Sequence, residues 1–309
     1  MGLVRSTLLA ASRSVWLRER ATRYGFVRRA VSRFLPGETL EDALTAAAAL
    51  RGRGMASVVT CLGENVASEA EVEGVTAHYL DVIDRVSQMG LDAEISVKLT
   101  HLGLDLGAPV TVRHLTRIVR RAAEAKTRVW IDMEDSSYTD ATIDVYRKMP
   151  DRSAVGICLQ AYLHRTPADL DMLMPQGPAI RLVKGAYREP PTTALPRKKD
   201  VDEMYFQLAG RLLAPEARRA GTWVVFGTHD PILIRRIQAH ARALEIPSTG
   251  FEFDLLYGIR RDEQERLARE GHRVRVLISY GTFWFPWYMR RLAERPANIW
   301  FLARNLIGG

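Results

Sequence analysis

Hydrophobic and polar positions follow two alternating patterns along most of this chain of 309 residues. Short apolar runs rich in Val, Ile and aromatic residues alternate with longer stretches whose apolar residues return every three or four positions. The first pattern predicts buried β-strands, and the second predicts amphipathic helices. The expected strands are residues 56–62, 93–99, 128–133, 155–160, 179–183, 222–228, 251–255 and 273–279.

Helical periodicity separates and follows these strand runs. The expected helices are residues 67–89, 112–125, 140–149, 167–173, 201–213, 232–244, 262–270 and 287–294, with a Pro-rich exposed loop at 188–200. Eight βα units in succession predict an α/β protein, a (β/α)₈ TIM-type barrel. A doubly wound open sheet is the alternative, but it normally has a Gly-rich turn after its first strand. Here the only candidate, Gly52-Arg53-Gly54, precedes that strand.

The composition fits a soluble globular protein, with 47% hydrophobic and 26% charged residues. This balance excludes collagen, coiled-coil and disordered classes. No apolar run approaches the ~18 residues that a membrane-spanning helix needs. Cys61 and Cys158 lie far apart and lack metal-ligand spacing, so we expect buried thiols in a reducing cytosol, with neither a disulfide nor a metal site.

The positive charge is concentrated at the N-terminus. The whole chain has a net charge of +8, and residues 1–35 contain eight Arg but a single acid, Glu19. A basic face for nucleic acid is therefore not expected. We divide the chain into an Arg-rich N-terminal helical segment, 1–36, and a barrel, 37–309. The segment suits helices packed on the barrel, our preferred interpretation, or an amphipathic arm at a membrane surface.

Polar side chains terminate several of the expected strands. They are Lys98, Asp132 to Asp135, Gln160, Arg181 with Lys184, and Thr228 to Asp230. Each has an ordinary structural explanation, such as a helix cap or a side chain reaching the rim. Catalysis in TIM-type barrels takes place at the C-terminal ends of strands, and buried charges are costly unless they are paired. Together these residues therefore predict a site. His229 lacks metal-ligand neighbours, so hydrogen bonding is its expected role.

An aromatic cluster at 280–288 precedes a pair of arginines, Arg290 and Arg291. This segment could provide core packing with a solvated basic face. It could equally provide a carboxylate clamp, because guanidinium binds carboxylate in bidentate geometry. Glu294 lies one helical turn from Arg290 and could hold it in place.

These segments resemble the proline dehydrogenase family, monofunctional bacterial type. The most specific pieces are Asp-Met-Glu-Asp at 132–135, Leu-Gln-Ala-Tyr-Leu at 159–163, Arg-Leu-Val-Lys-Gly-Ala-Tyr at 181–187, Thr-His at 228–229, Phe-Glu-Phe-Asp-Leu-Leu-Tyr-Gly at 251–258 and Tyr-Met-Arg-Arg at 288–291. The resemblance implies a distorted (β/α)₈ barrel that oxidises L-proline to Δ1-pyrroline-5-carboxylate, with FAD as cofactor and a quinone as electron acceptor.

The resemblance also implies roles for individual residues. Lys98, Asp132 and Arg181 match the reacting centre, and Lys98 also matches a substrate-binding position. Positions that hold FAD correspond to Met133, Gln160, Arg181, Lys184, Gly185, Ala186, Thr228 and His229. Tyr187 and Leu256 match residues that line the proline ring, and Arg290 with Arg291 matches the pair that grips its carboxylate. Lys98 and Asp132 could act as a coupled pair, and the base stays unassigned.

Two positions depart from the family pattern. Leu277 and Trp287 stand where relatives often carry tyrosine, which puts fine substrate preference in doubt but leaves the reaction class unchanged. Two alternatives stay open: another FAD barrel of the methylenetetrahydrofolate reductase type, and a catalytically inactive amino-acid-binding barrel. We expect a cytoplasmic protein that binds no nucleic acid, and peripheral contact with the inner face of the membrane through the basic segment is an open alternative.

Overall fold

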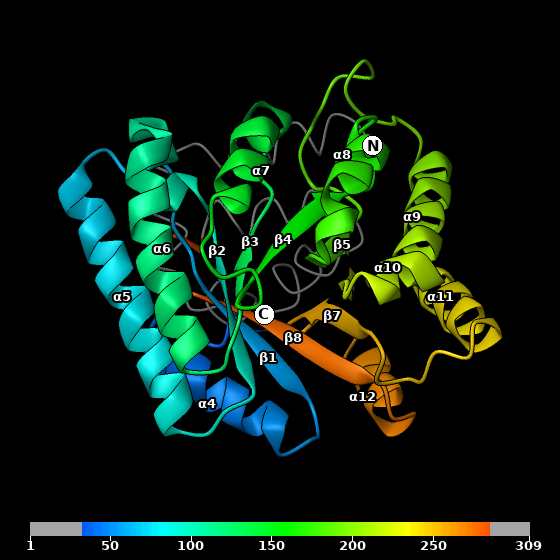
Figure 1. The fold of residues 1–309 in the computed structure, drawn as a ribbon. Coiled ribbons are helices and arrows are strands. Elements are labelled where there is room, and N and C mark those ends of the chain that lie inside the picture. The colour runs from blue at the N-terminus through cyan, green and yellow to red at the C-terminus, as the bar shows by residue number, and fades with distance from the viewer. Residues whose placement is uncertain (1–32, 285–309) are drawn as a thin grey trace, which may run out of the picture.

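The computed structural model describes residues 33–284, which fold into a closed barrel of parallel strands (Figure 1). The strands pair in chain order, and β8 closes the barrel on β1. They are β1 Ala56–Cys61, β2 Ala93–Val97, β3 Val129–Ile131, β4 Val155–Gln160, β5 Ala179–Val183, β6 Trp223–Gly227, β7 Glu252–Leu256 and β8 Arg273–Tyr280. The predicted TIM-type barrel is confirmed, and the open-sheet alternative is wrong.

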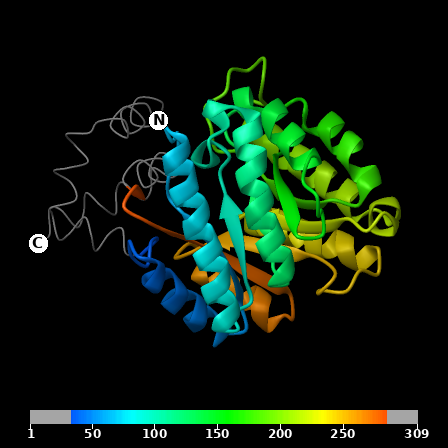
Figure 2. The same ribbon diagram turned by 60° about the vertical axis from the view of Figure 1, so that its left-hand side comes forward.

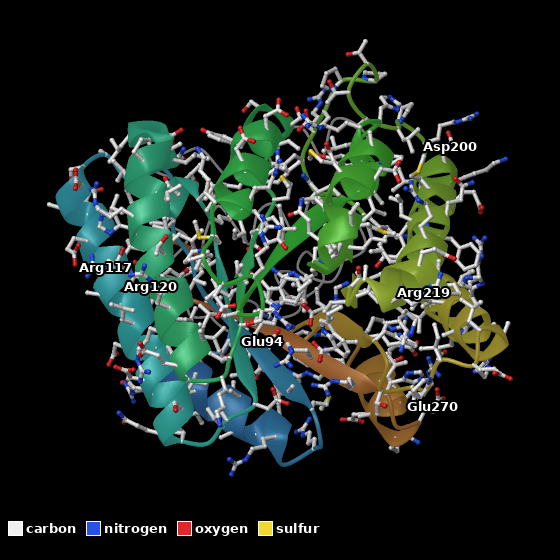
Figure 3. All side chains as sticks on the ribbon, in the orientation of Figure 1. Glu94, Arg117, Arg120, Asp200, Arg219 and Glu270 are labelled. Atoms are coloured by element: carbon white, nitrogen blue, oxygen red, sulfur yellow. The ribbon has the colours of Figure 1, made fainter. Side chains whose placement is uncertain are left out.

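Helices form the outer layer of the barrel (Figures 1 and 2). They are α5 Glu69–Gln88, α6 Ala108–Glu124, α7 Thr139–Arg147, α8 Thr166–Leu173, α9 Lys198–Leu213, α10 Pro215–Arg219, α11 Pro231–Ala243 and α12 Arg261–Arg269. Their outer faces are charged, as Arg117 and Arg120 on α6 illustrate (Figure 3). The expected helix at 287–294 and nearly all of the segment 1–36 lie outside the described residues, so those two predictions stay predictions.

A further helix, α4 (Leu40–Arg51), packs on β8 and β1 and covers the place where the barrel closes. The prediction missed it. Thr39 and Asp42 form a capping box at its start, in which the Thr39 side chain accepts from the backbone N–H of Asp42 and the Asp42 carboxylate accepts from that of Thr39. The short helix α10 was also missed.

The strands have two different faces. Alternate residues such as Ile95, Ile131 and Phe253 point outward into the main core beneath the helices. The inner face carries the charged residues Glu94, Arg181, Glu252, Asp254 and Arg275, each at most 9% exposed. The strands β7 and β8 are therefore less apolar than the short apolar runs expected from the sequence, because side chains alternate across a strand and the barrel interior here is largely polar.

An apolar layer crosses the middle of the barrel. It consists of Val58, Trp130, Ala179 and Val225, with Trp223 and Leu277 packed against it. The Trp130 ring fits against Gly156 on the next strand, where a Cβ would overlap the indole. Polar groups of the interior are thus divided into one set at the C-terminal ends of the strands and another at their N-terminal ends.

Candidate active site

A cavity of about 620 Å³ opens at the C-terminal ends of the strands. Its volume lies within the ~300–1,000 Å³ range of ordinary ligand sites. The cavity brings together every predicted site residue that the structure describes: Lys98, Asp132, Met133, Gln160, Arg181, Lys184, Gly185, Ala186, Tyr187, Thr228, His229 and Leu256. Residues from six strands, β2 to β7, and the loops after them thus meet in one place, as the interpretation of the strand ends predicts.

Arg181 occupies the centre of the cavity floor and is 2% exposed. Its Nη2 donates to Asp132 and, over 2.6 Å, to Ser96 Oγ, while its Nε lies 2.8 Å from Cys158 Sγ. The guanidinium carbon also lies 5.2 Å from the centroid of the Trp130 ring. Burial opposes the charge of Arg181, but the opposite effects of Cys158, Asp132 and Asp254 are larger and raise the pKa of Arg181. This side chain is therefore a fixed cation.

Asp254 on β7 is the second carboxylate that pairs with Arg181, and no role was predicted for it from the sequence. Its Oδ2 accepts from Arg181 Nη1 at 3.2 Å, and its side chain is 5% exposed. Its Oδ1 is buried and has no hydrogen-bond partner among residues 33–284. Burial raises the pKa of Asp254 to about 7, because the lowering effect of Arg181 does not compensate for it. The alternation of Glu252, Phe253, Asp254 and Leu255 is the signal that could have identified Asp254 as inward-facing.

Lys98 and Asp132 each form an ion pair with a different residue, and their action as a coupled pair stays a prediction. Lys98 makes an ion pair with Glu64, which follows β1, whereas Asp132 is engaged by Arg181. Ser96 Oγ also donates to Asp132 Oδ1 at 2.8 Å. Both residues line the cavity, but each has its own counter-ion. Glu64 and Ser96 were not predicted, because such pairings require the three-dimensional closure of the barrel.

Lys184 lies in a cluster of alternating charges on another wall of the cavity. Its Nζ donates to Asp202 and, over 2.9 Å, to Asp230 Oδ2, and Lys198 donates to the same two carboxylates. Asp230 also caps α11 by accepting from the backbone N–H of Ile232. These contacts fix Lys184 at the start of the loop 184–187 and leave its side chain only one quarter exposed.

The polar side chains of Gln160, Thr228 and His229 bind backbone groups around the cavity. Gln160 Nε2 donates to the Glu134 carbonyl at 2.8 Å, and Thr228 Oγ1 accepts from Asp230 N–H at 3.2 Å. His229 Nε2 accepts from Leu256 N–H at 2.8 Å. The predicted hydrogen-bonding role of His229 is confirmed.

Gly185 bears directly on what the cavity can hold. Its φ is +117°, and a Cβ there would overlap the Tyr162 ring. Gly185 therefore allows the Tyr162 ring to pack directly against the backbone of the loop that borders the cavity between Lys184 and Ala186. The cations Arg181 and Lys184 and the buried, unpartnered hydroxyl of Ser279 supply hydrogen-bond donors that suit a large anionic cofactor.

Several residues with expected roles cannot be placed. Arg290, Arg291, Trp287 and Glu294 lie outside the described residues, so the carboxylate clamp stays a prediction. Leu277, the other departure from the family pattern, lines the cavity.

Within the described part of the chain, no group of three or more His, Cys, Asp and Glu residues is arranged to hold a metal ion. No helix in that part is long and apolar enough to cross a membrane.

Comparison with known proteins places the chain in a family. The sequence model of the proline dehydrogenase family matches residues 43–304. Proline dehydrogenase 1 of Bacillus subtilis subsp. natto is 36% identical over 306 residues, 99% of both chains. Proline dehydrogenase of Deinococcus radiodurans is 36% identical over 283 residues, 90% of each chain.

The fold also has a solved counterpart. The crystal structure of proline utilization A (PutA) from Bdellovibrio bacteriovorus, inactivated by N-propargylglycine, matches with a TM-score of 0.79 and 24% identity. The match covers 87% of this chain and 33% of that one, so it supports the barrel architecture alone. Together with the family match and the full-length relatives, the convergent cavity leads to one conclusion: the chain is an oxidoreductase that belongs to the proline dehydrogenase family.

Proposed function

We propose that this protein oxidises L-proline to Δ1-pyrroline-5-carboxylate, with FAD as cofactor and a quinone as final electron acceptor. The observation that carries the proposal is the meeting of Lys98, Asp132 and Arg181 at the floor and wall of one cavity. The full-length relatives named proline dehydrogenase support the same substrate.

FAD fits the donor set of the cavity. Arg181 and Lys184 supply fixed cations, and Gly185 lies beside Lys184 in the wall of the cavity. Met133, Gln160, Ala186, Thr228 and His229 would complete the binding site, since all five line the same cavity. When bound, FAD would supply the hydride acceptor of the reaction. Arg181 would stabilise the negative charge that develops, because a preorganised cation needs no rearrangement.

The substrate would lie between the charged floor and an apolar wall. Tyr187 and Leu256 line the cavity and suit the carbon ring of proline. Lys98 and Asp132 present opposite charges to a zwitterion, with Glu64 and Arg181 respectively fixing their positions. Arg290 and Arg291 are proposed to bind the carboxylate.

Anaerobic addition of L-proline to the purified protein tests the proposal. We expect a flavin absorption spectrum that is bleached by L-proline and left unchanged by nicotinamide cofactors. Bleaching by a reduced nicotinamide alone would instead support the methylenetetrahydrofolate reductase type. A colourless protein that binds proline without turnover would support an inactive amino-acid-binding barrel.

We further propose a cytoplasmic location, with the Arg-rich segment 1–36 as a candidate for peripheral membrane contact, since quinones reside in the bilayer. Each cation near an anionic surface contributes about 1 kcal/mol. Sedimentation with anionic vesicles at low and high salt measures this contact. Absence of binding at low salt would leave the segment as a cover for the barrel.

A further inference from the structure

Among the charged residues of the cavity that the structure describes, Asp254 is distinguished by a buried side-chain oxygen that has no partner. Its Oδ2 faces Arg181 at 3.2 Å, whereas its Oδ1 has no partner within residues 33–284. The residue lines the cavity and is 5% exposed. A buried polar atom without a partner is uncommon in native proteins and marks a group with a task beyond packing.

We propose that Asp254 is a positioning residue that sets the charge Arg181 presents to the bound cofactor, by exchanging a proton with water. With a proton on Oδ1, Asp254 is neutral and Arg181 has a single carboxylate counter-ion, Asp132. Without it, two carboxylates surround one guanidinium, and the three groups together carry a charge of about −1. No covalent bond forms or breaks apart from the O–H bond of the carboxylic acid. This inference rests on the proposed function.

The charges around Asp254 place this proton exchange near neutrality. Arg181 on β5 and Arg275 on β8 favour the ionised form of Asp254, while Glu252 and Glu94 oppose it. Asp132, which follows β3, and the Cys158 thiol on β4 also contact Arg181. Burial raises the pKa of Cys158 to about 12, so this thiol is neutral. Desolvation is the largest effect on Asp254 and raises its pKa to about 7.

Reduction of the cofactor should therefore draw a proton to Asp254. A reduced flavin is more negative than an oxidised one, so its proximity favours the neutral carboxyl. By linkage, the protonated carboxyl in turn favours the reduced cofactor, because Arg181 is then less compensated. The proton comes from water during reduction and returns to water on reoxidation.

A purely structural role for Asp254 makes a different prediction. Asp132 and Ser96 already hold the guanidinium of Arg181 from the opposite side of the barrel. If Asp254 only fixed the Arg181 side chain, its replacement would affect stability and turnover but would leave no pH-dependent signature in the cofactor.

The flavin midpoint potential, measured by dye equilibration from about pH 5 to about pH 9, tests the proposal without using proline. Wild-type protein should show an additional pH-dependent segment centred near neutrality, and the Asp254→Asn variant should lack it. Glu263→Gln is the matched control, since Glu263 is a buried carboxylate paired with Arg266 at 2.7 Å on α12, outside the cavity. Parallel curves for wild type and Asp254→Asn would overturn the proposal.

Two further measurements keep the test decisive. Should Asp254→Asn fail to retain FAD, infrared difference spectra of the wild-type holoenzyme should contain a protonated carboxyl band at about pH 6 that is absent at about pH 9. Its absence at both values would refute the exchange. Glu252→Gln should move the additional segment to lower pH, because Glu252 raises the pKa of Asp254. Failure of L-proline to bleach the flavin would refute the proposed function and leave these potentials interpretable.

Discussion

The two ends of the barrel each contain a buried arginine among acidic side chains, but they satisfy it differently. At the N-terminal end, Arg275 donates to both oxygens of Glu252, to Asp92 and to the Ser57 carbonyl. None of the buried side-chain atoms of Arg275, Glu252 or Glu94 lacks a partner within the described residues. At the C-terminal end, the cluster around Arg181 leaves Asp254 Oδ1 open, and Ser279 Oγ is open in the same cavity.

This difference separates structural charge from functional charge. The N-terminal end also has a recess, of about 810 Å³, in which the lining carboxylates Asp92, Glu94 and Glu252 all pair with arginines. Glu94 illustrates the closure, since it accepts from the Trp130 indole at 2.6 Å and pairs with Arg275 at 3.3 Å. Volume alone therefore does not identify the active site. One buried atom without a partner also borders the N-terminal recess, the Nε of Arg128, so the C-terminal cavity differs in that its open atoms are oxygens, those of Asp254 and Ser279.

The largest expected effect comes from removing Arg275 at the N-terminal end of the barrel, the closed end, where the charges are paired. Arg275→Met should lower the free energy of unfolding by about 3–5 kcal/mol, because it leaves Glu252 and Glu94 buried without their main cation. Denaturant titration of the flavin-free protein measures the loss. Arg273→Met is the matched control on the same strand, since Arg273 is 45% exposed and should cost about 1 kcal/mol or less. Equal losses in the two variants would refute a structural role for the N-terminal cluster.

Removing Arg181 at the C-terminal end of the barrel, the open end, should affect catalysis more than stability. Arg181→Met should slow flavin reduction by L-proline by about 10²–10³-fold, the usual cost of one preorganised donor at a developing negative charge. The loss of stability should be smaller than for Arg275→Met, because Asp254 can take up a proton and Asp132 reaches solvent. Anaerobic stopped-flow spectroscopy measures the rate. An unchanged rate combined with a large loss of stability would place Arg181 among the structural charges.

The layer between the two ends can be strained directly. Gly156→Ala should cost about 1–3 kcal/mol, since the new Cβ overlaps the Trp130 ring and the ring has no free space. Gly74→Ala is the control, because a Cβ at this position in α5 meets no atom within 4 Å. It should stabilise the protein by about 0.4–1 kcal/mol. Thermal melting compares the two variants. An unchanged melting temperature of Gly156→Ala would mean that the Trp130 ring can move to make room for the new Cβ.

The smallest effect expected is a pH dependence of stability that comes from the open end. The pKa of Asp254 is raised by burial to about 7, so the neutral form stabilises the folded state below the ordinary pKa of Asp. That contribution is lost as the pH rises through about 7. The melting temperature of flavin-free wild type should fall by a few degrees, relative to Asp254→Asn, between about pH 5 and about pH 8. Identical pH profiles would contradict this assignment.

The strands and most helices could be predicted from the sequence because their periodicity is local. The expected strand 155–160 matches β4, and 179–183 matches β5. Boundaries shifted elsewhere, and β3 is confined to Val129–Ile131. Helix α4 was not predicted because its run of alanines forms no distinct polar face, although Thr39 and Asp42 supply a capping signal.

The membership of the site could also be predicted, whereas its pairings could not. Lys98, Asp132 and Arg181 stand out because ionisable groups are rare at strand ends. Their partners depend on contacts across the barrel, since Arg181 on β5 reaches Ser96 on β2, a strand with which β5 does not pair. The sequence separation of 85 residues leaves no local signal for such a contact.

The fit of Trp130 against Gly156 also limits how related chains can vary. Neither position can change freely, because a side chain at 156 needs the space that the indole fills, and a smaller ring at 130 leaves a void between the two charged ends. We therefore expect the two positions to covary in homologous barrels, with glycine opposite tryptophan and a larger residue opposite a smaller one.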